Sequence, residues 1–133
     1  MSFRRALIGL ALAGPLIVAG CSSRPPSLAP VEGRVTFAGS PLTRGVIVFT
    51  PDSERGSYGP SASAEIGPDG RYSLATEQAA GATPGWHRVT IAALDSGFGF
   101  RLPERFRDPN LSRLRAEIRP GQSNVVDFKL EGQ

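Results

Sequence analysis

The sequence predicts an all-β protein, a seven-stranded antiparallel β-sandwich. Three observations predict this fold class. Seven short runs between residues 31 and 133 alternate apolar and polar side chains with period two, as strands with one buried face do. Turn-forming residues separate the runs. No helix of useful length is expected after residue 20, and parallel strands would need helical crossovers.

Each expected strand places its apolar residues on one parity, so that one face points into the core. In the second run, for example, Ile47 and Phe49 share a face, and Pro51 ends the strand. In the fifth run, Val89 and Ile91 share the inward face. The seven expected strands are residues 31–37, 45–50, 62–66, 72–74, 86–92, 114–118 and 126–130.

Proline and glycine mark the turns. The strongest turn is residues 67–70, Gly-Pro-Asp-Gly, because proline presets φ and glycine accepts positive φ. Residues 62–74 are therefore expected to form a hairpin. Two longer loops, 51–60 and 95–113, are expected to be either functional or packed by their own side chains.

The charge of the chain argues against nucleic acid as a partner. The sequence has 15 Lys and Arg against 12 Asp and Glu, and Arg4 and Arg5 precede every acid. Without these two, 13 bases face 12 acids, a net charge of +1. Nucleic-acid binding calls for clustered cations instead.

Because Cys21 is the single cysteine in the sequence, no disulfide within the chain is possible.

Residues 1–20 have the pattern of an export signal. Arg4 and Arg5 precede an apolar run over residues 6–18. As a helix this run spans about 20 Å, short of the ~30 Å hydrocarbon core, which favours a signal peptide over a membrane span. The run ends in Val18-Ala19-Gly20-Cys21, which resembles the bacterial lipobox and implies cleavage before Cys21 and lipidation of its thiol. The alternative is an ordinary signal peptide followed by an unmodified cysteine.

Residues 21–30 are expected to form the lipidated cysteine and a proline-rich linker. A lipoprotein terminus carries two or three acyl chains, enough for stable anchoring. Three prolines in residues 22–30 favour an extended spacer of at most about 28 Å, which would hold the domain clear of the headgroups. Since Ser22 and Ser23 follow the cysteine and no aspartate does, the outer membrane or cell envelope is the favoured location of this exported protein.

Several stretches of residues 31–133 share their order and spacing with one known family. They are Val31-x-Gly33-x-Val35-x-Phe37-x-Gly39-x-Pro41-Leu42, Gly45-x-Ile47-x-Phe49-x-Pro51, Ile66-x-x-Asp69-Gly70-x-Tyr72-x-Leu74, Gly81-Ala82-x-Pro84-Gly85 and Val89-x-Ile91. In them the chain resembles the carboxypeptidase regulatory-like domain, and in particular the small lipoproteins of planctomycete bacteria built on it. The resemblance implies a transthyretin-like (prealbumin-like or Ig-like) sandwich that serves structure, adhesion or ligand contact.

Few residues could support catalysis. The single histidine, His87, has the inward parity, so a packed ring with one hydrogen bond is expected rather than a catalytic base. Zinc needs three or four ligands, and neither a metal nor a cofactor is expected. Solvated acids are favoured over a calcium site for Asp95, Glu104 and Asp108, because no D-x-D-x-D-G array is present. Residues 130–133 lack the Tyr-Arg-Gly-Ser motif of the transthyretin-like hydroxyisourate hydrolases.

One group of residues suggests a contact surface. Trp86 has the outward parity, and the loop 95–113 contains Phe98, Phe100 and Arg101. Aromatic and arginine side chains are enriched at such contacts, so these four residues could bind a sugar or a protein. The favoured alternative is that the phenylalanines cap the open end of the sandwich and the tryptophan covers an edge.

These features predict a membrane-anchored lipoprotein without enzymatic activity, an envelope-associated structural or binding module. The alternative is a domain that recognises or carries a small ligand or glycan through the loop 95–113. The expected partners are the lipid membrane, through acylated Cys21, and an envelope protein or glycan. A concave pocket lined by Trp86, Phe98 and Phe100 would favour ligand binding.

Overall fold

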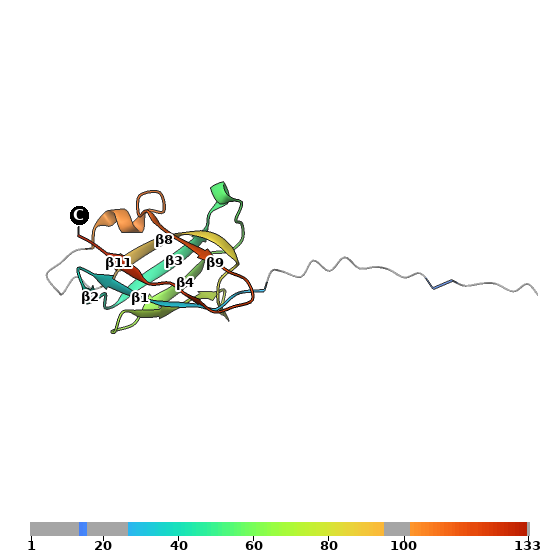
Figure 1. Cartoon of the computed structure of the whole chain (residues 1–133), viewed down its shortest axis with the longest axis horizontal. Coiled ribbons are helices and arrows are strands. Elements are labelled where there is room, and N and C mark those ends of the chain that lie inside the picture. The colour runs from blue at the N-terminus through green and yellow to red at the C-terminus, as the bar shows by residue number, and fades with distance from the viewer. Residues whose placement is uncertain (1–13, 16–26, 95–101, 133) are drawn as a thin grey trace, which may run out of the picture.

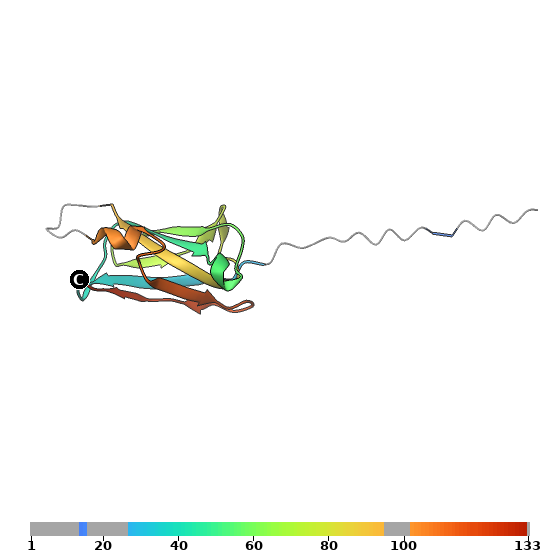
Figure 2. The same cartoon turned by 90° about the horizontal axis from the view of Figure 1, so that it is seen from above.

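A computed structural model describes residues 14–15, 27–94 and 102–132. The described residues form mainly strands and two short 3-10 helices, which confirms the predicted all-β class. The strands belong to two sheets that lie in separate layers (Figures 1 and 2). In this described part, every helix is too short or too polar to cross a bilayer.

The first sheet is built around β1, Val31–Phe37. Two strands pair with it in the antiparallel sense, β2 (Ser40–Pro41) and β5 (Arg71–Ser73). Two others, β10 (Asn124–Val125) and β11 (Phe128–Leu130), run parallel to it. The expected purely antiparallel pairing is therefore wrong for this sheet. No helical crossover is needed, because the second sheet lies in the chain between β1 and β10.

The second sheet is antiparallel throughout and has the strand order β7-β6-β4-β3-β8-β9. Its central pair is β3 and β8, with Ile47 opposite Ile91 and Phe49 opposite Val89. This register puts the apolar side chains of both strands on one face. The six strands are β3 (Gly45–Pro51), β4 (Ala62–Ile66), β6 (Ala75–Thr76), β7 (Ala79–Ala80), β8 (Gly85–Ala93) and β9 (Leu114–Ile118).

One apolar core lies between the two sheets. Phe49 of the second sheet is fully buried, and its ring centroid lies 6.2 Å from that of Tyr72 and 6.0 Å from that of Phe128, both in the first sheet. Such tilted and edge-on ring pairs add to the stabilisation from area burial. The inward parity predicted for Phe49, Val89 and Ile91 is confirmed, because all three are fully buried.

The turn at residues 67–70 forms, but residues 62–74 are not a hairpin. The amide of Gly70 donates to the carbonyl of Gly67 at 2.9 Å, which closes the turn. Strand β4 then pairs with β3 and β6, whereas β5 pairs with β1 in the other sheet. A turn constrains only its own backbone and does not decide which strand follows it in the sheet. Here β5 joins the first sheet, and the side chain of Tyr72 on this strand is buried in the core.

The folded part begins before residue 31. Ala29 forms an antiparallel bridge with Ala82 through two backbone hydrogen bonds of 2.9 and 3.0 Å. The side chain of Ala29 is buried, and the carbonyl of Pro30 accepts from the amide of Asn124 at 2.8 Å. The last residues of the expected spacer are therefore part of the domain, and the chain leaves it at one end of the sheets (Figure 1).

The described half of the long loop, residues 102–113, is packed by its own side chains. A 3-10 helix, η2 (Glu104–Arg107), places the buried ring of Phe106 in the core. Farther along, Ser112 donates its hydroxyl to the carbonyl of Val89 at 2.6 Å. This part of the loop is therefore structural. Residues 95–101 lie outside the described residues.

Candidate functional site

Among the residues predicted to make contacts, Trp86 lies in the described part of the chain. It lies on β8, half-buried, on the face turned away from the core, as its parity predicted. Its amide donates to the hydroxyl of Ser57 at 2.9 Å, and its carbonyl accepts from the amide of Asp52 at 2.9 Å. Four other predicted site residues lie outside the described residues, namely Cys21, Phe98, Phe100 and Arg101.

The indole of Trp86 is partly covered by a cation from its own chain. Arg55 belongs to the 3-10 helix η1 (Ser53–Arg55), and its guanidinium carbon lies 4.4 Å from the centroid of the Trp86 ring. Such cation–π contacts are favourable by about 0.5–1 kcal/mol at exposed sites. One face of the ring is therefore occupied, which limits its use as a stacking platform for a sugar.

A buried carboxylate holds η1 against β8. The side chain of Asp52 is 1% exposed, and its Oδ1 lies 3.2 Å from Nε of Arg88 and accepts from the amide of Glu54 at 3.2 Å. The carboxylate of Glu54 lies 2.7 Å from Nη2 of the same arginine. A buried charge that is paired and hydrogen-bonded is tolerated. Sequence reasoning missed this cluster because Asp52 and Arg88 are far apart in the chain.

His87 is a packed core residue, as its parity predicted. It is fully buried, its Nε2 donates to the carbonyl of Thr83 at 2.7 Å, and its ring centroid lies 5.9 Å from that of Phe49. Burial lowers the pKa of His87, and the hydrogen bond to Thr83 offsets only part of this effect. In the described ranges, no three His, Cys, Asp or Glu side chains gather in a way that could hold a metal ion.

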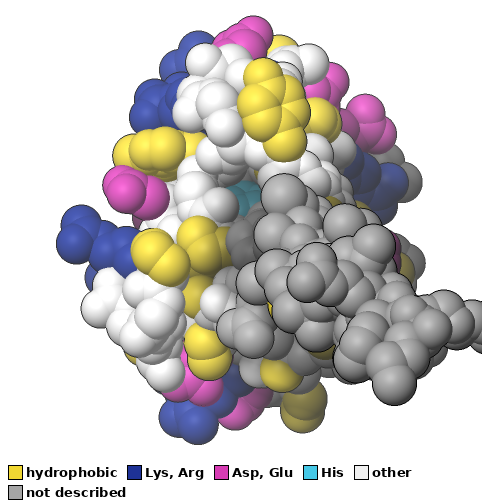
Figure 3. All heavy atoms as spheres, turned by 90° about the vertical axis from the view of Figure 1, so that its right-hand side faces the viewer, with side chains coloured by type: hydrophobic (Ala, Val, Ile, Leu, Met, Phe, Trp, Pro, Cys, Tyr) yellow, Lys and Arg dark blue, Asp and Glu magenta, His cyan; other side chains and the backbone are white. Residues whose placement is uncertain are grey.

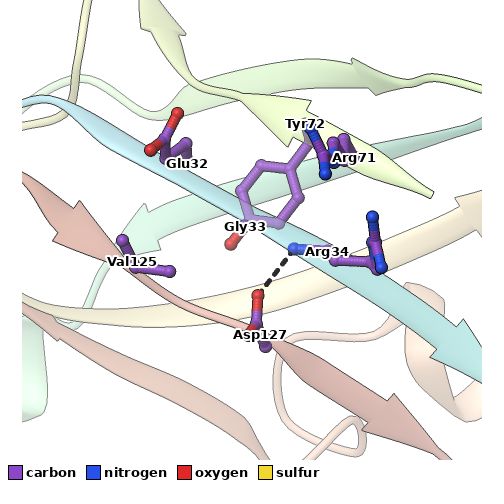
Figure 4. Close-up of a pocket in the computed structure, with 7 residues that line it drawn as sticks. All are labelled: Glu32, Gly33, Arg34, Arg71, Tyr72, Val125 and Asp127. Carbon is purple, nitrogen blue, oxygen red and sulfur yellow. Dashed lines mark hydrogen bonds between the residues drawn. The ribbon is translucent and has the colours of Figure 1, made fainter. Parts of the chain in front are cut away.

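A pocket opens on the first sheet, over β1 and β5 and beside the segment that joins β10 to β11 (Figure 4). Tyr72 lies opposite Gly33 across β1 and β5, and it donates its hydroxyl to the carbonyl of Val126 at 2.6 Å. A side chain at position 33 would bring its Cβ to 1.7 Å from that carbonyl oxygen and 2.9 Å from the tyrosine hydroxyl. Glycine is therefore required, and the aromatic ring fills the space beside it.

This pocket has a volume of about 420 Å³ and a lining that carries both signs of charge, from Glu32, Arg34, Arg71 and Asp127. Burial raises the pKa of Tyr72, and the nearby charge of Asp127 raises it further. The hydroxyl of Tyr72 therefore stays protonated, and its proton is donated to the carbonyl of Val126. Oδ1 of Asp127 accepts from the amide of Arg34 at 2.8 Å. These contacts connect β1, β5 and the C-terminal strands.

A larger and more apolar groove lies at the end of the domain where residues 27–30 meet the sandwich, and Figure 3 shows exposed hydrophobic side chains there. Its volume is about 600 Å³. Tyr58 is 75% exposed on its rim. Thr83 is only 6% exposed, and its Oγ1 has no hydrogen-bond partner among the described residues. The groove therefore offers mainly apolar walls, and the unpaired hydroxyl oxygen of Thr83 is itself buried. Its apolar lining includes Leu28, Tyr58, Pro60 and Ala79.

Comparison with known proteins identifies no family. No family model matches the chain, and no curated protein matches it. One solved structure that resembles it is the dioxygenase domain of a dioxygenase carbohydrate-binding protein fusion from the cellulolytic bacterium Streptomyces sp. SirexAA-E. The match has 21% sequence identity and a TM-score of 0.43, and it covers 84% of each chain.

The matched structure is an enzyme domain, which contradicts the prediction that this chain has no enzymatic activity, and we withdraw that prediction. A similarity in chain path transfers no activity by itself, because activity resides in particular side chains and their geometry. At this level of similarity the match assigns this chain neither a reaction nor a cofactor.

Proposed function

We propose that this protein is an exported bacterial lipoprotein, cleaved before Cys21 and anchored to a membrane by acyl chains on that cysteine. Its folded domain would then act as a structural or binding module of the cell envelope. One observation carries the proposal, the lipobox-like segment of residues 18–21 directly after an apolar run of signal-peptide length. The chain enters the domain at one end (Figure 1), beside the groove that Ser27 and Leu28 line. This supports the proposal, because a tether attached there leaves the rest of the surface accessible.

For residues 31–133 we infer a carboxypeptidase regulatory-like domain with a seven-stranded, prealbumin-like sandwich. The longer strands in the structure, β1, β3, β4, β5, β8, β9 and β11, fall on the seven alternating runs, and the other strands of the described part have two residues each. Two residues of the motifs that carry the resemblance, Gly33 and Tyr72, meet across the first sheet. Their contact gives a physical reason for finding both residue types in this order.

The anchor is tested by expressing the full chain in a bacterium supplied with an alkyne-tagged fatty acid. We expect the wild-type protein to take up the tag and to sediment with membranes. Cys21→Ser should lose the tag and accumulate as uncleaved precursor or leave the membrane fraction. Ser22→Ala is the matched control and should behave like wild type. Equal fatty-acid incorporation in the Cys21→Ser variant would refute the proposal.

A further inference from the structure

The end of the domain that carries the apolar groove is the end nearest to the proposed anchor. Ala29 is held by its bridge to Ala82, and Ser27 and Leu28 line the groove. Six residue steps separate Ser27 from Cys21, so the segment spans about 19 Å as polyproline II and at most about 22 Å when fully extended. This reach is shorter than the spacer expected from the sequence, because the structure places residues 27–30 on the domain.

The opposite end of the domain lies much farther from the anchor. Strand β1 runs from Val31, near the groove, to Phe37, and Ser40 begins β2 beyond the turn (Figure 1). The seven residues of β1 are six steps apart end to end and span about 20 Å. A tether of the length given above therefore keeps the groove end within reach of the bilayer. The turn before Ser40 lies at the far end of the domain, so Ser40 can serve as a control position away from the bilayer.

The groove has the chemistry of a surface that meets the bilayer interface. Tyr58 is a large apolar side chain with a polar tip, and tyrosine is enriched at the level of lipid headgroups. The groove beside it has mainly apolar walls. At the headgroup level a lipid offers hydrocarbon and ester or phosphate oxygens side by side. The apolar walls would then meet hydrocarbon, and the phenolic hydroxyl of the exposed Tyr58 would meet a headgroup oxygen.

We propose that this end of the domain rests against the lipid surface, with Tyr58 at the level of the headgroups and the groove open to lipid. The proposal rests on the proposed anchor at Cys21. The contact itself can be weak, because the tether makes it intramolecular and thereby raises the effective concentration of lipid at the groove.

The charges around the groove indicate which lipids it contacts. Glu77 lines the groove, and Glu54 is exposed on η1 beside the cation of Arg55. Asp52 and Arg88 pair with these side chains, so three acids face two bases here. This balance gives no net attraction to anionic lipid, which binds clusters of basic residues. The contact should therefore form on zwitterionic phosphatidylcholine and should persist at high salt, because screening weakens only interactions between exposed charges.

The test uses the full lipidated protein in phosphatidylcholine vesicles. Since the thiol of Cys21 is consumed by the lipid, an introduced cysteine is the single free thiol. Tyr58→Cys and Ser40→Cys, both at exposed positions, are labelled with the same fluorophore. The vesicles contain a phosphatidylcholine with a spin label on its headgroup, which quenches nearby fluorophores. We expect several-fold stronger quenching at position 58 than at position 40, at low and at high salt.

The outcomes separate this inference from the proposed function. A protein that sediments with vesicles but shows equal quenching at positions 58 and 40 overturns the inference and leaves the anchor intact. A protein that fails to sediment, with a reactive thiol at Cys21, overturns the anchor itself. If position 58 is shielded from a soluble quencher but is not quenched by the labelled lipid, a second copy or a soluble partner covers the groove, and the inference is wrong.

Discussion

Replacing Gly33 by alanine tests the closest backbone approach in the first sheet. The new methyl group would lie 1.7 Å from the carbonyl oxygen of Val126, so β1 must move away or Tyr72 must give up its 2.6 Å hydrogen bond. Overpacking costs about 1–3 kcal/mol, and loss of a buried hydrogen bond costs about 1 kcal/mol more. We therefore expect Gly33→Ala to lower the free energy of unfolding by about 2–4 kcal/mol.

The assay is urea unfolding of the detergent-solubilised protein, followed by the fluorescence of Trp86, the one tryptophan of the sequence. Gly132→Ala is the matched control, because its new Cβ meets only the ring of Phe37 at an ordinary 3.5 Å. Its effect should stay within about 0.5 kcal/mol. If Gly33→Ala changes the free energy of unfolding no more than this control does, the requirement for glycine at position 33 is refuted.

A double-mutant cycle separates the two contributions at this site. Tyr72→Phe removes the hydroxyl that donates to Val126 and should cost about 1 kcal/mol alone. In that background, Gly33→Ala should cost less than in wild type, because one of its close contacts is already gone. Full additivity would show that the backbone approach alone sets the cost.

Three further variants test the core and the buried charges by the same urea assay. Phe49→Ala should cost about 3–5 kcal/mol, because the ring is fully buried, and a loss under about 1 kcal/mol would contradict its place in the core. Burial lowers the pKa of His87 in the folded state, so the unfolded chain binds a proton more readily than the folded protein does. The neutral ring therefore stabilises the fold fully above the unfolded pKa of 6.5, and this part of the free energy of unfolding is lost as the pH falls below that value. His87→Asn should reduce the fall in stability between about pH 7 and pH 5. Asp52→Asn should cost about 2 kcal/mol, since Arg88 loses its buried carboxylate partner and keeps the exposed Glu54 and the side-chain amide of Asn110, and an unchanged midpoint and Trp86 emission would disprove the role of this carboxylate.

The sequence by itself determined which side chains enter the core. Apolar–polar alternation is a property of each strand alone, because successive side chains point to opposite faces whatever the strand pairs with. The inward parity of Phe49 and His87 and the outward parity of Trp86 could therefore be read without knowing any neighbour. The turn at residues 67–70 was equally local, because proline and glycine specify its backbone angles.

Only the tertiary structure decided which strands are neighbours and what each outward residue contacts. Strand β5 follows a turn that would suit a hairpin, yet it pairs with β1, where the ring of Tyr72 lies beside Gly33. In the same way, the partner of Trp86 is Arg55, and the partner of Asp52 is Arg88. Each of these contacts joins segments that are distant in the chain. The free energy of each such contact depends on how the two sheets pack, and no local sequence pattern encodes that packing.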